Sequence, residues 1–291
     1  MATGTVTRRR SCELTERDAA ALMWVAEQYG ARLDVLSVLL ARLAGRAEPL
    51  SIWGVRNQVD RWQRMRLVTA DRVLGATWVT PTRAGLDRAG AEFPVWRVPA
   101  AKLAHTHAVS VVRLAYEATS QAQSRPWVCE RATWKERGKM GWHVPDGVLR
   151  DPAEDETSRS VAVEVELTLK TRKQYRAEVI GNLRNGTAVL WYFTPSQPFA
   201  RVLETHVTAA IEAARTDVKA MVRPLPHVPG VTYMGKVGAL CVKYKDRRPA
   251  ANCRPGDSPT SITAASPRPL WSWRCCACPR PSWPRPRGWR C

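Results

Sequence analysis

Several features that define other classes of protein are missing from this 291-residue sequence. No apolar run reaches the roughly 18 residues that a membrane-spanning helix needs, which argues against a helical membrane protein. The first residues, MATGTVTRRRSCEL, include basic side chains but no apolar stretch behind them, which argues against a secretory signal. We therefore expect a cytoplasmic protein that has no contact with a membrane.

Acidic residues are also scarce. The chain has 26 Asp and Glu against 45 Lys and Arg, a formal net charge of +19. An excess of this size needs a polyanionic or acidic partner, and nucleic acid is the general one. Arg247–Cys291 contains nine Arg and one acid, Asp257, so it contributes +8 and leaves +11 for the rest. The protein is therefore basic even without its tail.

The C-terminal tail, residues 246–291, is rich in Arg, Pro, Trp and Cys and has almost no aliphatic residues after Leu270. Such a segment cannot bury a core, so we expect it to be disordered. Its composition also resembles out-of-frame translation of a GC-rich gene, and a native tail and a frameshifted end stay open as alternatives. Its cysteines lack the paired C-x-x-C spacing of structural zinc sites.

Residues 15–90, after a flexible stretch over residues 1–14, have the pattern of a small helical domain. Thr15 begins a capping pattern, T-E-R-D, and apolar residues recur after it at helical spacing. This spacing and the glycine stops predict helices over 15–30 and 33–45, a third helix from Ser51, strands over 67–70 and 76–80, and a short helix. The order is typical of a winged helix-turn-helix, which inserts its last helix into the DNA major groove.

The outward face of the third predicted helix carries polar side chains that suit DNA. Arg56, Asn57, Arg61 and Arg64 lie on it, and Arg72 follows in the predicted ribbon. Arginine contacts phosphates and guanine edges, and asparagine contacts adenine edges. We predict that these five residues bind DNA. A winged helix that binds another protein, or a merely basic amphipathic helix, would leave a similar pattern.

A linker over residues 91–100 leads to a second predicted domain, residues 101–245. Its patterns alternate between the helical period and the strand period. They predict, in order, a helix over 102–120, strands over 127–134, 143–149 and 161–170, a helix over 171–183, a strand over 187–193 and a helix over 199–218. The order α-β-β-β-α-β predicts an α/β (α+β) fold, with a mixed sheet covered by helices.

The strand predicted over Val161–Lys170, VAVEVELTLK, has an apolar face and a charged face. Because side chains alternate along a strand, Glu164, Glu166 and Lys170 share the second face. Asp146 lies 18 residues before Glu164, so a neighbouring strand would bring a third carboxylate to the pair. Clustered carboxylates are the ligands that Mg²⁺ requires. A half-exposed strand with a solvated charged face is the alternative.

Two acids, a nearby lysine and this order of elements resemble the PD-(D/E)XK nuclease superfamily. The resemblance implies that Asp146, Glu164 and Glu166 hold a metal ion, and that a lysine polarises the attacking water. The third motif position is Glu166, where the superfamily usually has lysine. Lys170 lies about 13 Å further along the strand at 3.3 Å per residue, so it or Lys173 could substitute only if the strand bends.

Residues 15–220 as a whole resemble the replication-relaxation family of plasmid and integrated-element proteins. The segments that carry the resemblance are LTERDAAALMWVAEQYG, WVTPTRAGL, HTHAVSVVRLAYEA, VPDGVL, VAVEVELTLKTRKQYRAEV and AVLWYF. The resemblance implies a role in plasmid replication and in relaxation of plasmid DNA, with double-stranded DNA as the partner.

The residues beside the acidic strand have two interpretations each. Arg172, Lys173 and Arg176 would hold a DNA phosphate against the metal, or would only neutralise the acids. His105 and His107 lie two residues apart and so not on one helix face, which favours a core or hydrogen-bonding His105 over a metal pair.

Two functions therefore stay open. One is a Mg²⁺-dependent endonuclease that nicks DNA at a site chosen by the winged helix. The other is a non-enzymatic transcriptional or replication regulator with a relic nuclease domain. The sequence leaves the oligomeric state open, a homodimer included.

Overall fold

The computed structural model describes residues 14–97, 99–137, 143–150 and 160–232. The predicted disordered tail and residues 1–13 lie outside these ranges. Within them, no helix is both long enough and apolar enough to cross a membrane.

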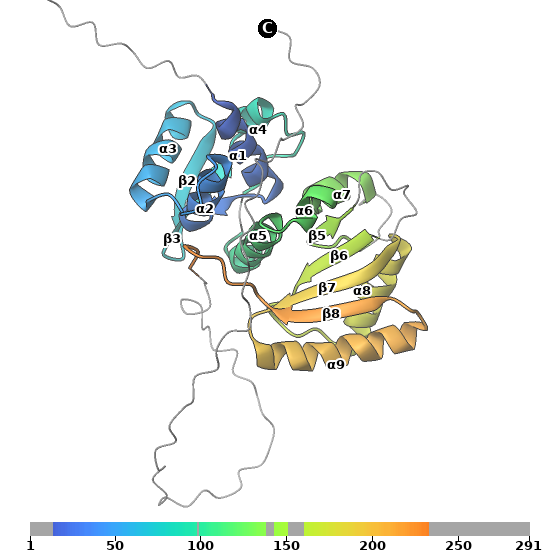
Figure 1. The fold of residues 1–291 in the computed structure, drawn as a ribbon. Helices are drawn as coiled ribbons and strands as arrows, with labels where there is room; N and C mark the ends of the chain where they lie inside the picture. Colours follow the sequence, from blue (N-terminus) through green and yellow to red (C-terminus); the bar gives the residue numbers. More distant parts are fainter. Residues whose placement is uncertain (1–13, 98, 138–142, 151–159, 233–291) are drawn as a thin grey trace, which may run out of the picture. The chain divides into compact units, whose positions relative to one another are not determined.

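The N-terminal unit combines helices with a small sheet (Figure 1). The sheet is antiparallel with strand order β1-β3-β2. The elements are α1 (Glu16–Glu27), β1 (Ala31–Arg32), α2 (Leu33–Leu43), α3 (Ile52–Arg64), β2 (Val68–Val73), β3 (Ala76–Pro81) and α4 (Arg83–Ala89). These confirm the predicted helices and two strands, whereas β1 was not predicted.

Local sequence explains where these helices begin. The Thr15 hydroxyl accepts from the backbone N–H of Asp18, and the Asp18 carboxylate accepts in return from the Thr15 N–H, which makes a capping box. Ser51 caps α3 in the same way, through the N–H of Gly54. The β2–β3 turn has Leu74 and Gly75 at positive φ, as a two-residue hairpin requires.

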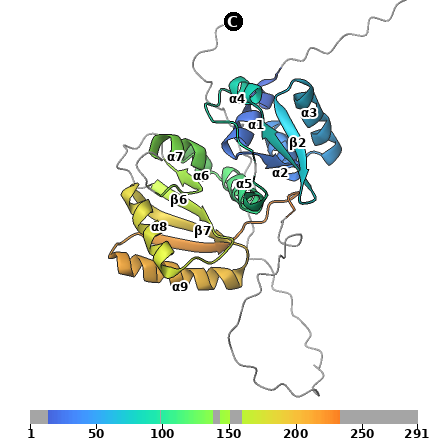
Figure 2. The same ribbon diagram turned by 180° about the vertical axis from the view of Figure 1, so that it is seen from behind.

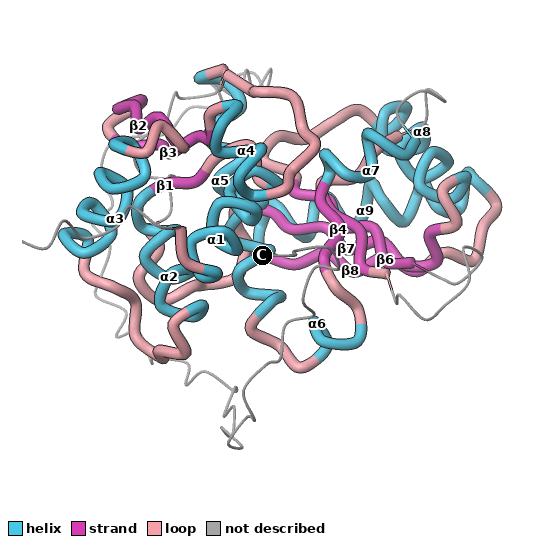
Figure 3. The backbone as a smooth tube through the Cα atoms, turned by 90° about the horizontal axis from the view of Figure 1, so that it is seen from above, coloured by secondary structure: helices cyan, strands magenta, loops and turns pink. Residues whose placement is uncertain are grey.

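A five-stranded mixed sheet forms the second part of the fold, with order β4-β5-β6-β7-β8. Strands β4 (Trp127–Cys129), β5 (Gly147–Leu149) and β6 (Ser160–Val165) are antiparallel neighbours, and β7 (Thr187–Thr194) and β8 (Lys219–Pro224) continue from β6 in parallel. The predicted mixed α/β fold is confirmed. Figure 3 shows the strands of the two sheets as separate groups.

Helices cover both faces of this sheet, as the opposite views of Figures 1 and 2 show. On one face, α5 (Leu103–Glu117) packs on β6 through a core that includes Val109, Val112 and Val163. On the other, α8 (Arg172–Arg184) and α9 (Gln197–Ala214) pack on Ala162, Leu190 and Tyr192. The remaining helices are η1 (Ala100–Lys102), α6 (Gln121–Ser124) and α7 (Glu130–Arg137).

Four predictions about this part of the fold were wrong. The first strand ends at Cys129, where α7 begins and the Thr133 hydroxyl donates to the Cys129 carbonyl. Strand β5 starts at Gly147 rather than at residue 143. The last predicted helix ends at Ala214, because Arg215 adopts a left-handed conformation, and β8 follows it.

The fourth error concerns the acidic strand. It ends at Val165 rather than Lys170, and every residue from Ser160 to Val165 is buried. The alternative of a half-exposed strand with a solvated charged face is therefore wrong, because helices cover both faces.

Helix α5 belongs to two hydrophobic cores. Val111 and Leu114 pack in the core of the N-terminal unit, whereas Val109 and Val112 pack against the five-stranded sheet. The buried Arg113 strengthens the contact with α1. Its guanidinium donates to Glu27 and to Glu117, each at 2.6 Å, and lies 4.9 Å from the ring centroid of Trp24. The indole N–H of Trp24 donates to Glu117 at 2.9 Å.

We expect Arg113→Ala to lower the free energy of unfolding by roughly 3–5 kcal/mol, because it leaves two carboxylates without their buried counter-charge. Urea denaturation measures the change. Arg201→Ala, on the exposed face of α9, is the control and should change stability by less than about 0.5 kcal/mol. Equal stabilities for the two variants would contradict this role of Arg113.

The segment after β8 returns to the N-terminal unit. The backbone N–H of Thr232 donates to Asp34 at 2.9 Å, and its carbonyl accepts from Nε2 of His107 at 3.0 Å. Burial lowers the pKa of His107 to about 4, and the charge of Arg32 acts in the same direction. His107 is therefore neutral in the folded protein at neutral pH.

We expect His107 to destabilise the fold in acid. Its folded pKa is below the unfolded value of about 6.5, so the unfolded chain binds more protons as the pH falls from 6.5 to 4. The loss should reach about 2–3 kcal/mol at pH 4. His107→Gln should remove this part of the pH dependence in urea denaturation, whereas His227→Gln, at an exposed histidine, should retain it.

Candidate functional site

An acid pocket forms where β6 meets α8. We use this name for the carboxylates of Asp146, Glu164, Glu166 and Glu178. Glu164 lies at the end of β6, and Glu166 follows it with its N–H bonded to the Phe193 carbonyl at 2.8 Å. A capping box between Thr171 and Gln174 begins α8, which turns Tyr175, Glu178 and Asn182 toward the sheet. The side chains of Glu164 and Glu166 are both buried, and each residue is 4% exposed.

Glu164 is held by one histidine and one amide. Its Oε1 accepts from His143 Nε2 at 2.6 Å and from Asn182 Nδ2 at 3.0 Å. Burial, together with the nearby Glu178 charge, raises the pKa of Glu164 to about 7. Burial lowers the pKa of His143, but the hydrogen bond and charge of Glu164 outweigh it, so the net direction is upward. The hydrogen bond therefore couples the protonation of the two side chains.

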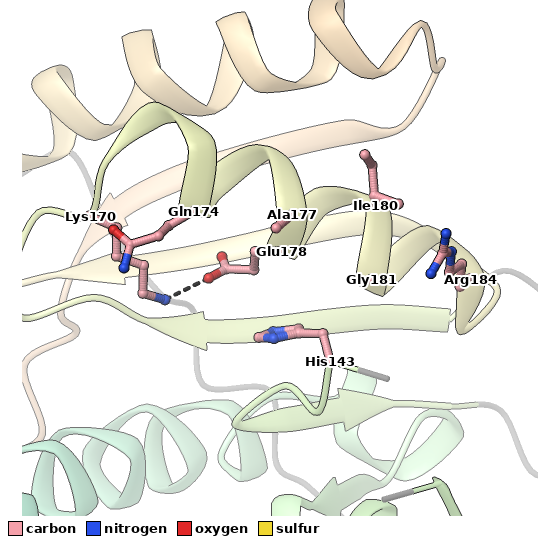
Figure 4. A pocket seen from close by; sticks show the side chains of 8 residues that line it. All are labelled: His143, Lys170, Gln174, Ala177, Glu178, Ile180, Gly181 and Arg184. Atoms are coloured by element: carbon pink, nitrogen blue, oxygen red, sulfur yellow. Dashed lines mark hydrogen bonds and ion pairs between the residues drawn. The ribbon is translucent and has the colours of Figure 1, made fainter. Parts of the chain in front are cut away.

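Lys170 closes the other side of the acid pocket. Its Nζ forms ion pairs with Glu166 and, at 2.5 Å, with Glu178 (Figure 4). The phenol of Tyr192 donates to the second oxygen of Glu178 at 2.8 Å. Because β6 ends at Val165, Lys170 does not lie about four residues further along the same strand. The chain bends after the strand and brings Lys170 to Glu166. This is the bend that the sequence analysis required before Lys170 could replace the motif lysine.

Asp146 faces a different set of partners. Its Oδ1 lies 2.7 Å from Nε2 of His105 on α5, and its Oδ2 accepts from the Val165 N–H at 2.7 Å. Burial lowers the pKa of His105, but the Asp146 charge and hydrogen bond raise it to about 9 overall. The hydrogen-bonding role predicted for His105 is confirmed, and this histidine is a cation at neutral pH.

The group with the spacing of metal ligands differs from the predicted one. Among the described residues, three potential ligand atoms lie within 4.8 Å of one another in a single group, His143, Glu164 and Glu178. Of the predicted ligands, Asp146 and Glu166 are not in it. Sequence reasoning missed His143 and Glu178. The available signal was the spacing of Tyr175, Glu178 and Asn182, which places a carboxylate on the buried face of α8.

An open pocket of about 490 Å³ lies over this group and is lined by His143, Lys170, Glu178, Gly181 and Arg184, among others (Figure 4). Gly181 permits the approach of His143 to α8. A Cβ added at Gly181 would lie 2.4 Å from the Cβ of His143, which is too close for any side chain. The glycine therefore positions the imidazole.

The predicted basic residues of α8 lie on its outer surface. Arg172, Lys173 and Arg176 are exposed. The partners that the structure shows for Glu164 and Glu166 are His143, Asn182 and Lys170 instead. The interpretation that the three cations only neutralise those acids is therefore not supported by the contacts of Glu164 and Glu166.

Four of the five residues predicted to contact DNA are exposed to solvent, three on helix α3 and one on strand β2. Arg56, Asn57, Arg64 and Arg72 are exposed. Arg61 differs, because its guanidinium forms an ion pair with Asp18, a fully buried residue that also accepts from Gln58 at 2.9 Å. Burial raises the pKa of Asp18, but bonds from Thr15 and the charge of Arg61 lower it overall. Arg61 therefore fixes α3 to α1.

Comparisons with known proteins add no assignment to this geometry. No protein-family model matches the chain, and no curated protein or solved structure is significantly similar to it.

Proposed function

We propose that this chain is a cytoplasmic DNA-binding protein of plasmid replication and DNA relaxation. Residues 15–90 act as a winged helix-turn-helix that selects the site on double-stranded plasmid DNA, and residues 101–245 act as a PD-(D/E)XK nuclease-like domain that cuts or holds it. The observation that carries the proposal is the acid pocket itself, in which buried carboxylates and Lys170 lie beside the exposed cations of α8.

The residues of the acid pocket fit a divalent cation. Glu164 and Glu166 both have pKa values raised to about 7, chiefly by burial, so their charge is under-compensated. Oxygen ligands of this kind suit Mg²⁺, and the resemblance assigns it to Asp146, Glu164 and Glu166. Asp146 and Glu166 would have to move toward Glu164 to hold it, because they lie outside the group with metal-ligand spacing. When bound, Mg²⁺ supplies positive charge beside a phosphate and lowers the pKa of water. The chain contributes Lys170 next to the acids and Arg172, Lys173 and Arg176 for the phosphates.

A regulator with a relic nuclease domain is the second candidate, and one contact favours it. Lys170 is held between Glu166 and Glu178, so its ammonium is occupied by two carboxylates rather than free for a substrate. In this function the acid pocket stabilises the fold, and the exposed surface of α3 performs the biological role.

Incubation of supercoiled plasmid with purified protein and Mg²⁺ or Mn²⁺ tests the two candidates. The nuclease should produce open-circular DNA. Glu164→Gln should abolish this product because it removes a charged ligand, whereas Glu204→Gln, on the exposed face of α9, should retain it. A gel shift without nicking at any metal concentration would reject the nuclease and leave the regulator.

Two arginines of α3 should separate DNA contact from stability. Arg56→Ala should weaken specific DNA binding by roughly 1–3 kcal/mol if Arg56 contacts a base edge, with little change in stability. Arg61→Ala should lower the free energy of unfolding by roughly 1–3 kcal/mol, because Asp18 stays buried without its counter-charge.

Gel shifts at several salt concentrations and urea denaturation of both variants measure these effects. If Arg56→Ala binds every DNA site as the parent does, Arg56 does not contact base edges. If Arg61→Ala unfolds like the parent, the ion pair with Asp18 contributes nothing to stability.

A further inference from the structure

The strongest unassigned feature is the group formed by His143, Glu164 and Glu178. Its ligand atoms come from three separate parts of the chain: the segment before β5, the end of β6, and the middle of α8. Their mutual separations, all within 4.8 Å, are compatible with ligands around one ion whose bonds are roughly 2.0–2.2 Å long. Figure 4 shows His143 and Lys170 on the same side of α8, with Lys170 nearer the start of the helix.

A buried amide beside this group gives a second, independent observation. Asn182 is fully buried, and its Nδ2 donates to Glu164 at 3.0 Å. Its Oδ1 has no hydrogen-bond partner among the described residues. A buried acceptor without a partner costs roughly 1–3 kcal/mol, so it points to something absent from the metal-free protein. Asn182 lies one helical turn after Glu178, on the same face of α8.

We propose that His143, Glu164 and Glu178 bind one transition-metal dication of the Mn²⁺, Fe²⁺ and Zn²⁺ class in preference to Mg²⁺. The Asn182 amide turns over when the ion binds, which exchanges its Nδ2 bond to Glu164 for a contact between its unpartnered Oδ1 and the ion. The imidazole carries this preference, because nitrogen ligands suit transition metals, whereas Mg²⁺ favours oxygen and water. The proposal rests on the proposed function for the presence of a metal in this pocket, but it changes the ligands and the ion.

Lys170 competes with the ion for Glu178. Its ammonium lies 2.5 Å from Glu178 Oε2, the oxygen that is not bonded to Tyr192. Metal at Glu178 therefore displaces Lys170, which retains its ion pair with Glu166. The exchange predicts that removal of the ammonium strengthens metal binding, an effect that a purely structural ion network would not produce.

The experiment is titration of the full-length, metal-free protein with Mn²⁺ and with Mg²⁺, followed by calorimetry and by the electron paramagnetic resonance of free Mn²⁺. Mn²⁺ is the probe because cysteines of the tail would take Zn²⁺. The parent should bind Mn²⁺ at least about 10-fold more tightly than Mg²⁺. His143→Ala should raise the Kd for Mn²⁺ at least about 10-fold, and Lys170→Met should lower it.

Two further variants keep the result interpretable. Asp146→Asn should retain Mn²⁺ binding, whereas it should lose binding if the ligands are Asp146, Glu164 and Glu166. Asp146 bonds to His105 and to Val165 rather than to the competing Lys170. Gly181→Ala should weaken Mn²⁺ binding without removing a ligand, because its methyl group displaces His143. The chain has only five histidines, so the imidazole NMR signal of His143 can be assigned. Broadening of this signal by Mn²⁺ reports binding near His143 in the folded protein.

Equal affinity of parent and His143→Ala for Mn²⁺, or tighter binding of Mg²⁺ than of Mn²⁺ by the parent, would overturn the proposal. DNA binding is measured separately by gel shift without metal. Loss of metal selectivity with DNA binding intact rejects this inference alone, and absence of DNA binding with selective Mn²⁺ binding rejects the proposed function alone.

Discussion

The ion pairs of Lys170 connect the two elements that build the acid pocket. Its single ammonium pairs with two buried carboxylates, Glu166 after β6 and Glu178 on α8. The Lys170 backbone N–H also donates to the phenol of Tyr175 at 3.1 Å. These contacts fix the turn between β6 and α8, and so decide where the helix lies on the sheet. Without them, two buried acids would repel each other at the centre of the fold.

Helix α5 extends this order to the N-terminal unit. Some side chains of α5 pack in the core of the N-terminal unit, and others pack in the core against the five-stranded sheet. Arg113 connects α5 to α1, and His105 binds Asp146 at the edge of the acid pocket. Asp146 in turn accepts from the N–H of Val165, where β6 ends. A continuous set of packed and charged groups therefore connects the helical unit to the pocket. A displacement of α5 would therefore shift groups in both the N-terminal unit and the acid pocket, because packed cores deform little.

The sequence predicted the elements whose signals are local. Thr15, Ser51 and Thr171 cap helices where the pattern predicts them, and the helical period sets the buried faces. The end of β6 could not be predicted in this way, because alternation continues to Lys170 in the sequence. Beyond Val165 the chain leaves the sheet, and Lys170 pairs with Glu166 and Glu178, contacts that the alternation does not indicate. The metal-ligand group escaped prediction for the same reason, because His143, Glu164 and Glu178 meet only in three dimensions.

The same contacts determine what an ion in the acid pocket would have to displace. Lys170 pairs with Glu166 and Glu178, and Glu164 accepts from His143. An ion bound at Glu178 would compete with Lys170, so its net affinity would be the difference between two favourable arrangements. A pocket of this kind stays closed to weakly binding cations and opens to ions with strong nitrogen and oxygen bonds.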